Sequence, residues 1–206
     1  MDVSGNESII DRYNTSPYNK HVKLVTTNTS KPFGNFIHTK QFSHVANVLI
    51  DDDVKRQTVI RFEPLDNNIF NENAEYIYIF TINDNIVKIG GTRNGLKDRA
   101  NSYLCGHSIK ERGKKGKCSI TNAYIYNTFD FYLQQGCEIK MYGYRLPKVD
   151  IDAEIFGQIT KINAQTYHAY ESILIQTYCD QFGHTPALND NSDPEYRKNK
   201  KGTKTK

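Results

Sequence analysis

The chain has 206 residues and a formal net charge of +4. No stretch approaches the roughly 20 apolar residues of a membrane helix, and the N-terminus lacks the charged and apolar regions of a signal peptide. These features exclude a membrane protein and favour one cytoplasmic domain with an appendage. The four cysteines are sparse and irregularly spaced, so free thiols are expected.

Positive charge gathers at two places in the chain. Residues 194–206 carry six cations and one carboxylate, a net charge of +5, so residues 1–193 together carry −1. A second basic run lies at residues 110–117. The body of the protein is therefore not basic, and the tail is either a solvated segment or a contact for a polyanion.

Residues 1–72 are predicted to form an N-terminal extension. Residues 1–30 are polar and rich in Asn, Ser and Thr. Apolar side chains recur every three or four positions over residues 42–50, which predicts a helix. Residues 59–62 are predicted to form a short strand that ends at Pro64.

Residues 75–103 contain the most informative pattern in the chain. Residues 76–80 are a run of β-forming side chains, residues 83–85 supply turn chemistry, and the apolar run resumes at residues 86–89. A Gly-Gly pair breaks the second strand, and helical spacing follows over residues 96–103. This segment therefore predicts a β-hairpin followed by a helix.

Three further elements are predicted downstream. Ser119 is a good N-cap for a helix that ends at Gly136. Residues 138–144 are predicted to form a third strand. Residues 165–182 are predicted to form a long amphipathic helix, with Gly183 as its C-terminal cap.

Tyr78, Lys88 and Arg99 are suited to phosphodiester chemistry and lie close together in this pattern. Residues placed symmetrically about a hairpin turn lie side by side, so Tyr78 and Lys88 are expected to share one face. The pattern resembles the catalytic core of the GIY-YIG nuclease superfamily, in which Gly-Ile-Tyr and Tyr-Ile-Gly motifs precede a helical arginine. Here the motifs read Tyr-Ile-Tyr at residues 76–78 and Lys-Ile-Gly at residues 88–90.

With lysine at its first position, the second motif is similar to that of one branch of the family. This branch contains phage-type nuclease domains and some type II restriction enzymes. In the restriction enzymes of that branch, a tyrosine follows the arginine by one helical turn, as Tyr103 follows Arg99 here. The family also has a glutamate on a downstream helix, which Glu171 matches, and an asparagine that closes the core, which Asn189 matches. The resemblance covers about residues 75–189.

The resemblance implies an α/β fold built on a small three-stranded antiparallel sheet flanked by helices, over residues 73–190. Residues 1–72 are then an arm that contacts DNA, and residues 191–206 are a basic flexible tail. The additional helix between Arg99 and the third strand either shapes DNA recognition or braces the sheet.

The implied function is a Mg²⁺-dependent endonuclease of double-stranded DNA, most simply a type II restriction enzyme. A phage or mobile-element nuclease is the alternative enzyme. A rival of a different class is a nucleic-acid-binding protein whose tyrosine-rich sheet stacks on bases without cutting them. One active site cuts one strand, so a homodimer on DNA is expected.

Each catalytic candidate has an expected role. Tyr78 is the base, and because a free phenol has a pKa of about 10, Lys88 must lower that pKa or accept the proton. Arg99 neutralises charge on the phosphate. Glu171 supplies an oxygen ligand for one Mg²⁺ ion per active site, and Tyr103 orients phosphate or water.

Each candidate also has a structural interpretation. Tyr78 can be an ordinary strand residue, Arg99 can lie on a solvated helix face, and Glu171 can pair with a cation at the edge of the core. Lys88 is less ordinary, because lysine is seldom buried without a partner. The order and spacing of the whole set favour the catalytic interpretation.

DNA contacts are expected from the basic run after the predicted catalytic helix. Its cations are Lys110, Arg112, Lys114, Lys115 and Lys117. A zinc site at Cys105, His107 and Cys118 is disfavoured, because the spacing lacks a paired Cys-x-x-Cys motif.

Overall fold

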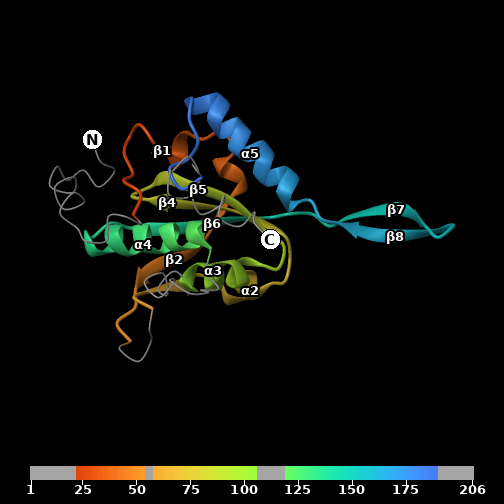
Figure 1. Ribbon diagram of the computed structural model, residues 1–206, viewed down its shortest axis with the longest axis horizontal. Coiled ribbons are helices and arrows are strands. Elements are labelled where there is room, and N and C mark those ends of the chain that lie inside the picture. Colours follow the sequence, from red (N-terminus) through yellow and green to blue (C-terminus); the bar gives the residue numbers. More distant parts are fainter. Residues whose placement is uncertain (1–21, 54–57, 106–118, 190–206) are drawn as a thin grey trace, which may run out of the picture.

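The computed structural model describes residues 22–53, 58–105 and 119–189. These residues form a six-stranded antiparallel sheet with helices on both faces, and a two-stranded ribbon that projects from the body (Figure 1). The sheet has the strand order β1-β5-β4-β6-β2-β3. Its strands are β1 (Lys31–Pro32), β2 (Ser43–Ile50), β3 (Ile60–Pro64), β4 (Tyr76–Ile82), β5 (Asn85–Thr92) and β6 (Ile139–Arg145).

The remaining elements connect these strands. The helices are α2 (Asn67–Asn71), α3 (Leu96–Leu104), α4 (Ile120–Gln134) and α5 (Tyr167–Phe182), with two 3₁₀ turns, η2 (Phe33–Asn35) and η3 (Thr39–Gln41). The ribbon consists of β7 (Val149–Ile155) and β8 (Gln158–Ala164). The sequence predictions did not include this ribbon, although the apolar residues alternate along residues 149–155 and a glycine follows.

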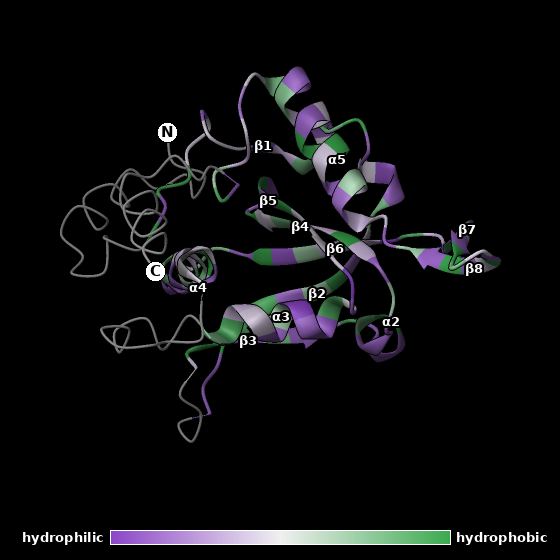
Figure 2. Cartoon of the chain, turned by 45° about the vertical axis from the view of Figure 1, so that its right-hand side comes forward, coloured by the Kyte–Doolittle hydropathy of each residue, from purple (hydrophilic) through white to green (hydrophobic). Residues whose placement is uncertain are grey.

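The sheet separates two hydrophobic clusters. Side chains alternate along β4, so Tyr78 and Phe80 pack on one face while Ile77 and Ile79 pack on the other. Helices α3 and α4 cover the first face, and α5 covers the second (Figure 2). Every residue of β4 is buried, so the strand that carries the first motif lies in the middle of the core.

The helix predicted over residues 42–50 is wrong, because residues 43–50 form strand β2 between β3 and β6. A β-bulge interrupts its pairing with β6 between His44 and Ala46. Val45 and Ala46 are consequently both buried, which breaks the two-residue alternation of a strand. The resulting apolar spacing imitates a helix, and only the partner strands distinguish the two.

The predicted antiparallel sheet flanked by helices is confirmed, but the sheet has six described strands rather than three. Residues 31–64, which were assigned to the N-terminal extension, supply β1, β2 and β3. Val48 of β2 and Ile60 of β3 are fully buried in the same cluster as Tyr78. The extension therefore completes the core that holds the candidate site.

Two predicted helix caps are confirmed. Ser119 Oγ accepts a hydrogen bond from the Asn122 N–H at 3.1 Å where α4 begins. Gly183 ends α5 in the left-handed conformation, with a φ of 81°. None of the helices in the described ranges is both long and apolar enough to cross a membrane. The predicted tail, residues 191–206, lies outside the described residues.

The cysteines differ in part from the expectation of free thiols. Cys137, which is buried, and Cys179 are thiols outside any disulfide bond. Cys105 is disulfide-bonded, so the expectation is wrong for this residue. Cys118 lies outside the described residues.

Candidate active site

Tyr78, Arg99 and Tyr103 form a hydrogen-bonded cluster on the face of the sheet covered by α3. The two tyrosine hydroxyl oxygens lie 2.6 Å apart. Arg99 Nε donates to both, at 2.8 Å to Tyr78 and 3.1 Å to Tyr103. The guanidinium carbon also lies 4.5 Å from the centre of the Tyr103 ring. Both tyrosines are fully buried, so they hold the guanidinium in a fixed position.

The local sequence explains why these groups meet. Arg99 and Tyr103 are four residues apart on α3, which places them on one side of the helix. Gly90 lies opposite Tyr78 in the β4–β5 pair. A Cβ atom on Gly90 would collide with the ring and hydroxyl of Tyr78. The glycine of the second motif is therefore required for the tyrosine of the first motif to fit.

Lys88 reaches the Tyr78 face through an irregularity in the hairpin. Beyond Phe80 the β4–β5 register shifts by one residue, so Lys88 lies opposite Phe80, two residues from Tyr78. Without this bulge Lys88 would lie opposite Ile79 and point to the other face of the sheet. The predicted shared face of Tyr78 and Lys88 is confirmed, and the bulge is the reason.

The Lys88 side chain is buried, and its charge interacts with the charges of Glu171 and Arg99. Burial lowers the pKa of Lys88 to about 8; the Glu171 carboxylate opposes this shift, and Arg99 adds to it. Within the described parts of the chain, Lys88 makes no hydrogen bond or ion pair. A buried lysine of this kind is a neutral amine in about half of the molecules near pH 8.

The pKa of Tyr78 depends on burial and on neighbouring groups. Burial raises the pKa of Tyr78, although Arg99 and Tyr103 lower it in part. Lys88 is not among the groups that lower this pKa, so the lowering of the Tyr78 pKa by Lys88 stays a prediction. The alternative role of Lys88 as proton acceptor agrees with a pKa of about 8.

Glu171 approaches β5 from α5, on the other face of the sheet. A Cβ atom on Gly91 would lie 3.2 Å from Glu171 Oε2. The charge of Glu171 acts on the pKa of both Tyr78 and Lys88. The Gly-Gly pair at the end of the second motif therefore leaves room for a phenol on one face and a carboxylate on the other.

Asn189 closes the open edge of β5. Its side-chain amide donates to the Ile89 carbonyl oxygen at 2.8 Å and accepts from the Ile89 N–H at 2.8 Å. The amide replaces the backbone of a neighbouring strand, which keeps these edge groups paired. This contact agrees with the predicted closing position of Asn189.

Glu171 is the carboxylate of the candidate site that could hold a metal ion. In residues 22–53, 58–105 and 119–189, no group of three His, Cys, Asp or Glu side chains could hold a metal ion. Mg²⁺ commonly keeps several waters and binds proteins through one or two carboxylates together with substrate phosphates. Glu171 alone suffices for that mode, whereas structural zinc needs four protein ligands.

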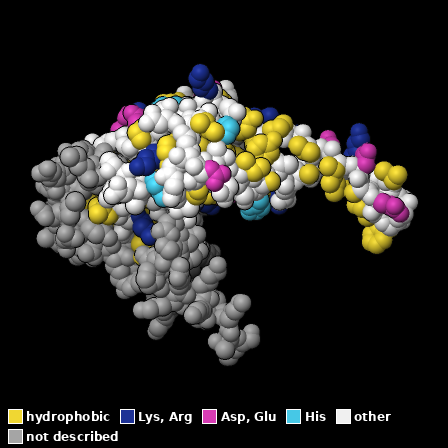
Figure 3. All heavy atoms as spheres, turned by 90° about the horizontal axis from the view of Figure 1, so that it is seen from above, with side chains coloured by type: hydrophobic (Ala, Val, Ile, Leu, Met, Phe, Trp, Pro, Cys, Tyr) yellow, Lys and Arg dark blue, Asp and Glu magenta, His cyan; other side chains and the backbone are white. Residues whose placement is uncertain are grey.

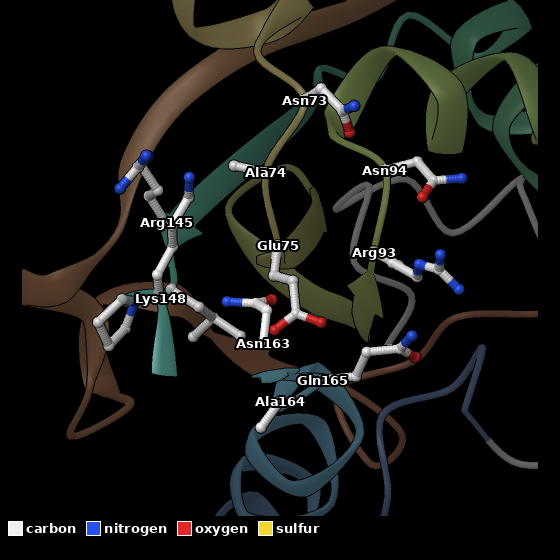
Figure 4. Close-up of a pocket in the computed structure, with 12 residues that line it drawn as sticks. Asn73, Ala74, Glu75, Arg93, Asn94, Arg145, Lys148, Asn163, Ala164 and Gln165 are labelled. Carbon is white, nitrogen blue, oxygen red and sulfur yellow. The ribbon is translucent and has the colours of Figure 1, made fainter. Parts of the chain in front are cut away.

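A pocket of about 320 Å³ lies at the end of the sheet where β5 runs into α3 (Figure 4). Arg93 and Lys148 line it and form no ion pair with any described residue. Glu75, at its centre, accepts hydrogen bonds through Oε2 from the Thr166 N–H at 2.9 Å and hydroxyl at 3.0 Å. The pocket thus offers two cations that are not in ion pairs, and a third, Arg145, that is paired with Glu72.

The structure brings the five predicted catalytic side chains to one strand pair and the two helices that flank it. The five predicted DNA-contacting cations lie outside the described residues: Lys110, Arg112, Lys114, Lys115 and Lys117. Arg93 and Lys148 were not among the predicted site residues. A positional signal existed for Arg93, which lies in the link between β5 and α3.

The comparisons with known proteins bear on the fold. No protein-family model and no curated protein matches the chain. Among solved structures, the chain is similar to the restriction endonuclease Hpy188I in complex with product DNA, with 19% identity over 76% of this chain and 84% of that chain, and a TM-score of 0.52. A mutant of bacteriophage T4 EndoII is also similar, with 21% identity over 69% of this chain and 92% of that chain, and a TM-score of 0.44.

The chain has the fold of Hpy188I, which is a GIY-YIG nuclease. This similarity of fold agrees with the resemblance that the two motifs, the helical arginine and the downstream glutamate indicate.

Proposed function

We propose that this protein is a Mg²⁺-dependent endonuclease that hydrolyses double-stranded DNA in the cytoplasm, as a type II restriction enzyme. The observation that carries the proposal is the Arg99 guanidinium, which two buried phenols hold beside an unpaired buried lysine and the carboxylate of Glu171. The fold of a restriction enzyme solved with product DNA adds support.

Arg99 is suited to neutralise the phosphate that is attacked. Burial lowers the pKa of Arg99, but the phenols of Tyr103 and Tyr78 outweigh burial and raise it. The guanidinium therefore stays charged at any working pH. Its Nε is occupied by the two hydroxyls, so its remaining N–H groups are available to the phosphate oxygens.

Lys88 and Tyr78 divide the task of activating water. Tyr78 is a neutral phenol at neutral pH because burial raises its pKa, so it orients the water through a hydrogen bond. The Lys88 amine, with a pKa of about 8, accepts the proton. The Tyr103 hydroxyl is hydrogen-bonded to both the Tyr78 hydroxyl and Arg99, and so holds them in position.

Glu171 would hold the metal. A bound Mg²⁺ ion would supply charge stabilisation to the phosphate and to the leaving 3′-oxygen. The unpaired cations of the pocket, Arg93 and Lys148, would hold a neighbouring phosphate of the same strand. Together these groups position one strand of the duplex across β5.

Incubation of the purified protein with plasmid DNA and Mg²⁺ tests the proposal. Discrete fragments that end in 5′-phosphate and 3′-hydroxyl support a restriction endonuclease. Non-specific cleavage supports the phage or mobile-element alternative. Retarded but intact DNA, with Mg²⁺ or Mn²⁺ present, would show a non-catalytic binding protein.

A further inference from the structure

The ribbon β7–β8 extends away from the body of the molecule (Figure 1). Its strands pair over their full length, from Val149 opposite Ala164 to Ile155 opposite Gln158. Two-stranded hairpins are marginally stable in water when nothing packs on them. Because the ribbon projects from the body, it lacks the packing against the core that usually stabilises such a hairpin.

The two faces of the ribbon differ in character, because side chains alternate along each strand. One face is mostly apolar, with Thr160 and Gln158 as its polar residues. Its three isoleucines are exposed, Ile151 at 46%, Ile155 at 44% and Ile162 at 37%. The other face carries Asp150, Asp152, Glu154, Ile159, Lys161 and Asn163. An exposed apolar face of this kind marks an interaction surface.

The turn at the tip of the ribbon carries an apolar residue, Phe156, at a position where turns of this kind favour asparagine. Phe156 is fully exposed, and its φ is 52°, followed by Gly157 with a φ of 78°. Two consecutive positive φ values favour Asn-Gly, and a bulky residue at the first position is strained. Asparagine would suit the turn better, so the turn itself does not explain the phenylalanine.

The charge of the ribbon argues against DNA as its partner. Three carboxylates and one lysine give residues 149–164 a net charge of −2. Phosphate backbones attract cations and repel such a surface. A wedge side chain that enters DNA is normally flanked by Arg or Lys, and here Phe156 is flanked by Ile155 and Gly157. The apolar face is therefore suited to a protein surface.

We propose that the ribbon is an exchange arm whose apolar face and Phe156 tip dock on a second copy of this chain. The receiving surface is the outer side of α5 near the ribbon base, where Ile173 is 62% exposed. Hydrophobic side chains continue from this part of the body along the arm (Figure 3). Reciprocal exchange across a two-fold axis then covers both arms.

An exchange of arms buries more area than a contact between two ribbon faces. A seven-residue strand pair presents a face about 24 Å long and about 10 Å wide, whereas a stable interface buries about 800 Å² per partner. A contact between two ribbon faces alone is therefore too small. In an exchange, each copy contributes both its arm and the surface that receives the partner's arm, which enlarges the interface.

The need for a dimer rests on the proposed endonuclease function, because each chain has one candidate site and a duplex has two strands. The apolar face and the strained tip do not depend on that function. Dimerisation and DNA cleavage are therefore measured in separate experiments.

Phe156→Asn is the sharpest variant, because it improves the turn while it removes the aromatic tip. Sedimentation of the full chain without DNA should show a dimer whose dissociation constant rises about 30-fold or more in this variant. The pair Ile151→Thr and Ile162→Thr should weaken it similarly while keeping β-forming side chains. Ile159→Thr, the same substitution on the opposite face, should leave it unchanged.

On supercoiled plasmid with Mg²⁺, the wild type should yield linear DNA directly, and Phe156→Asn should accumulate nicked circles. A wild-type monomer at every concentration, or unchanged assembly in Phe156→Asn, would overturn the proposal. A variant that stays dimeric but loses DNA affinity would assign the tip to DNA instead. Weakened assembly together with a complete absence of cleavage in the wild type would uphold the arm and refute the nuclease.

Discussion

The hydroxyl oxygens of Tyr78 and Tyr103 lie 2.6 Å apart, and one N–H group of Arg99 is shared between them. The two tyrosines come from different elements, β4 and α3, so their contact fixes helix and strand relative to each other. Both phenols are buried, and burial raises the pKa of each. The pair therefore stays protonated at neutral pH and acts as one rigid hydrogen-bonded unit.

The unequal roles of the two tyrosines can be measured. Tyr78→Phe should reduce the single-turnover cleavage rate by about 10²-fold or more, because it removes the group that orients water. Tyr103→Phe should cost less, since Arg99 keeps Tyr78 as its acceptor. The double variant should be no slower than Tyr78→Phe, because groups that act as a unit are not additive. Additive losses would show that the tyrosines act independently.

Gly90→Ala should displace the Tyr78 ring, since the added Cβ collides with it. We expect a lower melting temperature and a cleavage rate close to that of Tyr78→Phe. Gly34→Ala is the matched control, because a Cβ there has no neighbour within 4 Å. Equal melting temperatures for the two variants would contradict the assigned contact.

Lys88→Met should stabilise the protein while it abolishes cleavage. The folded-state pKa of Lys88, about 8, lies below its usual 10.5, so the unfolded state binds more protons between these values. Lys88 therefore costs stability, on the order of 3 kcal/mol below pH 8, and this cost fades as pH rises towards 10.5. Urea unfolding at pH 7 and pH 10 measures it, and a stability gain independent of pH would contradict the buried charge.

The same pKa predicts that the wild-type cleavage rate rises with pH and levels off above about 8. A rate that is already level at pH 6 would remove Lys88 from the role of proton acceptor.

Glu171→Gln should abolish cleavage and leave DNA affinity nearly intact, because it removes a metal ligand and not a DNA contact. Asp180→Asn, on the same helix, is the control: Asp180 accepts a hydrogen bond from Gln176 at 2.7 Å and should not affect cleavage. Calorimetric titration with Mn²⁺ gives a readout independent of activity. If binding of DNA fell as far as cleavage, Glu171 would be structural.

Arg93→Ala combined with Lys148→Ala should weaken DNA binding at every sequence. Each lost phosphate contact reduces the slope of log affinity against log salt by about 0.9, so the pair should reduce it by about two units. Arg61→Ala, a cation already paired with Glu63 at 3.0 Å, should leave the slope unchanged. Anisotropy titrations at several salt concentrations, in Ca²⁺ to prevent cleavage, distinguish these outcomes.

Local features of the sequence determined the elements around the site. The turn at Asn83 and Asp84 is built on positive φ values at both residues, which asparagine and aspartate tolerate. Caps at Ser119 and Gly183 set the ends of α4 and α5. These are short-range effects, so the pattern alone predicted the β4–β5 hairpin, the helices α3, α4 and α5, and the order of the catalytic candidates.

Only the tertiary structure decided what depends on pairing between distant segments. Residues 43–50 look helical because a bulge disrupts their alternation, and β3 and β6 hold them as a strand. A second bulge turns Lys88 to the face of Tyr78. Burial, which no spacing predicts, lowers the pKa of Lys88 and raises that of Tyr78. Register and desolvation are properties of the whole packed sheet, and for that reason the roles of these two residues could not be read from the sequence.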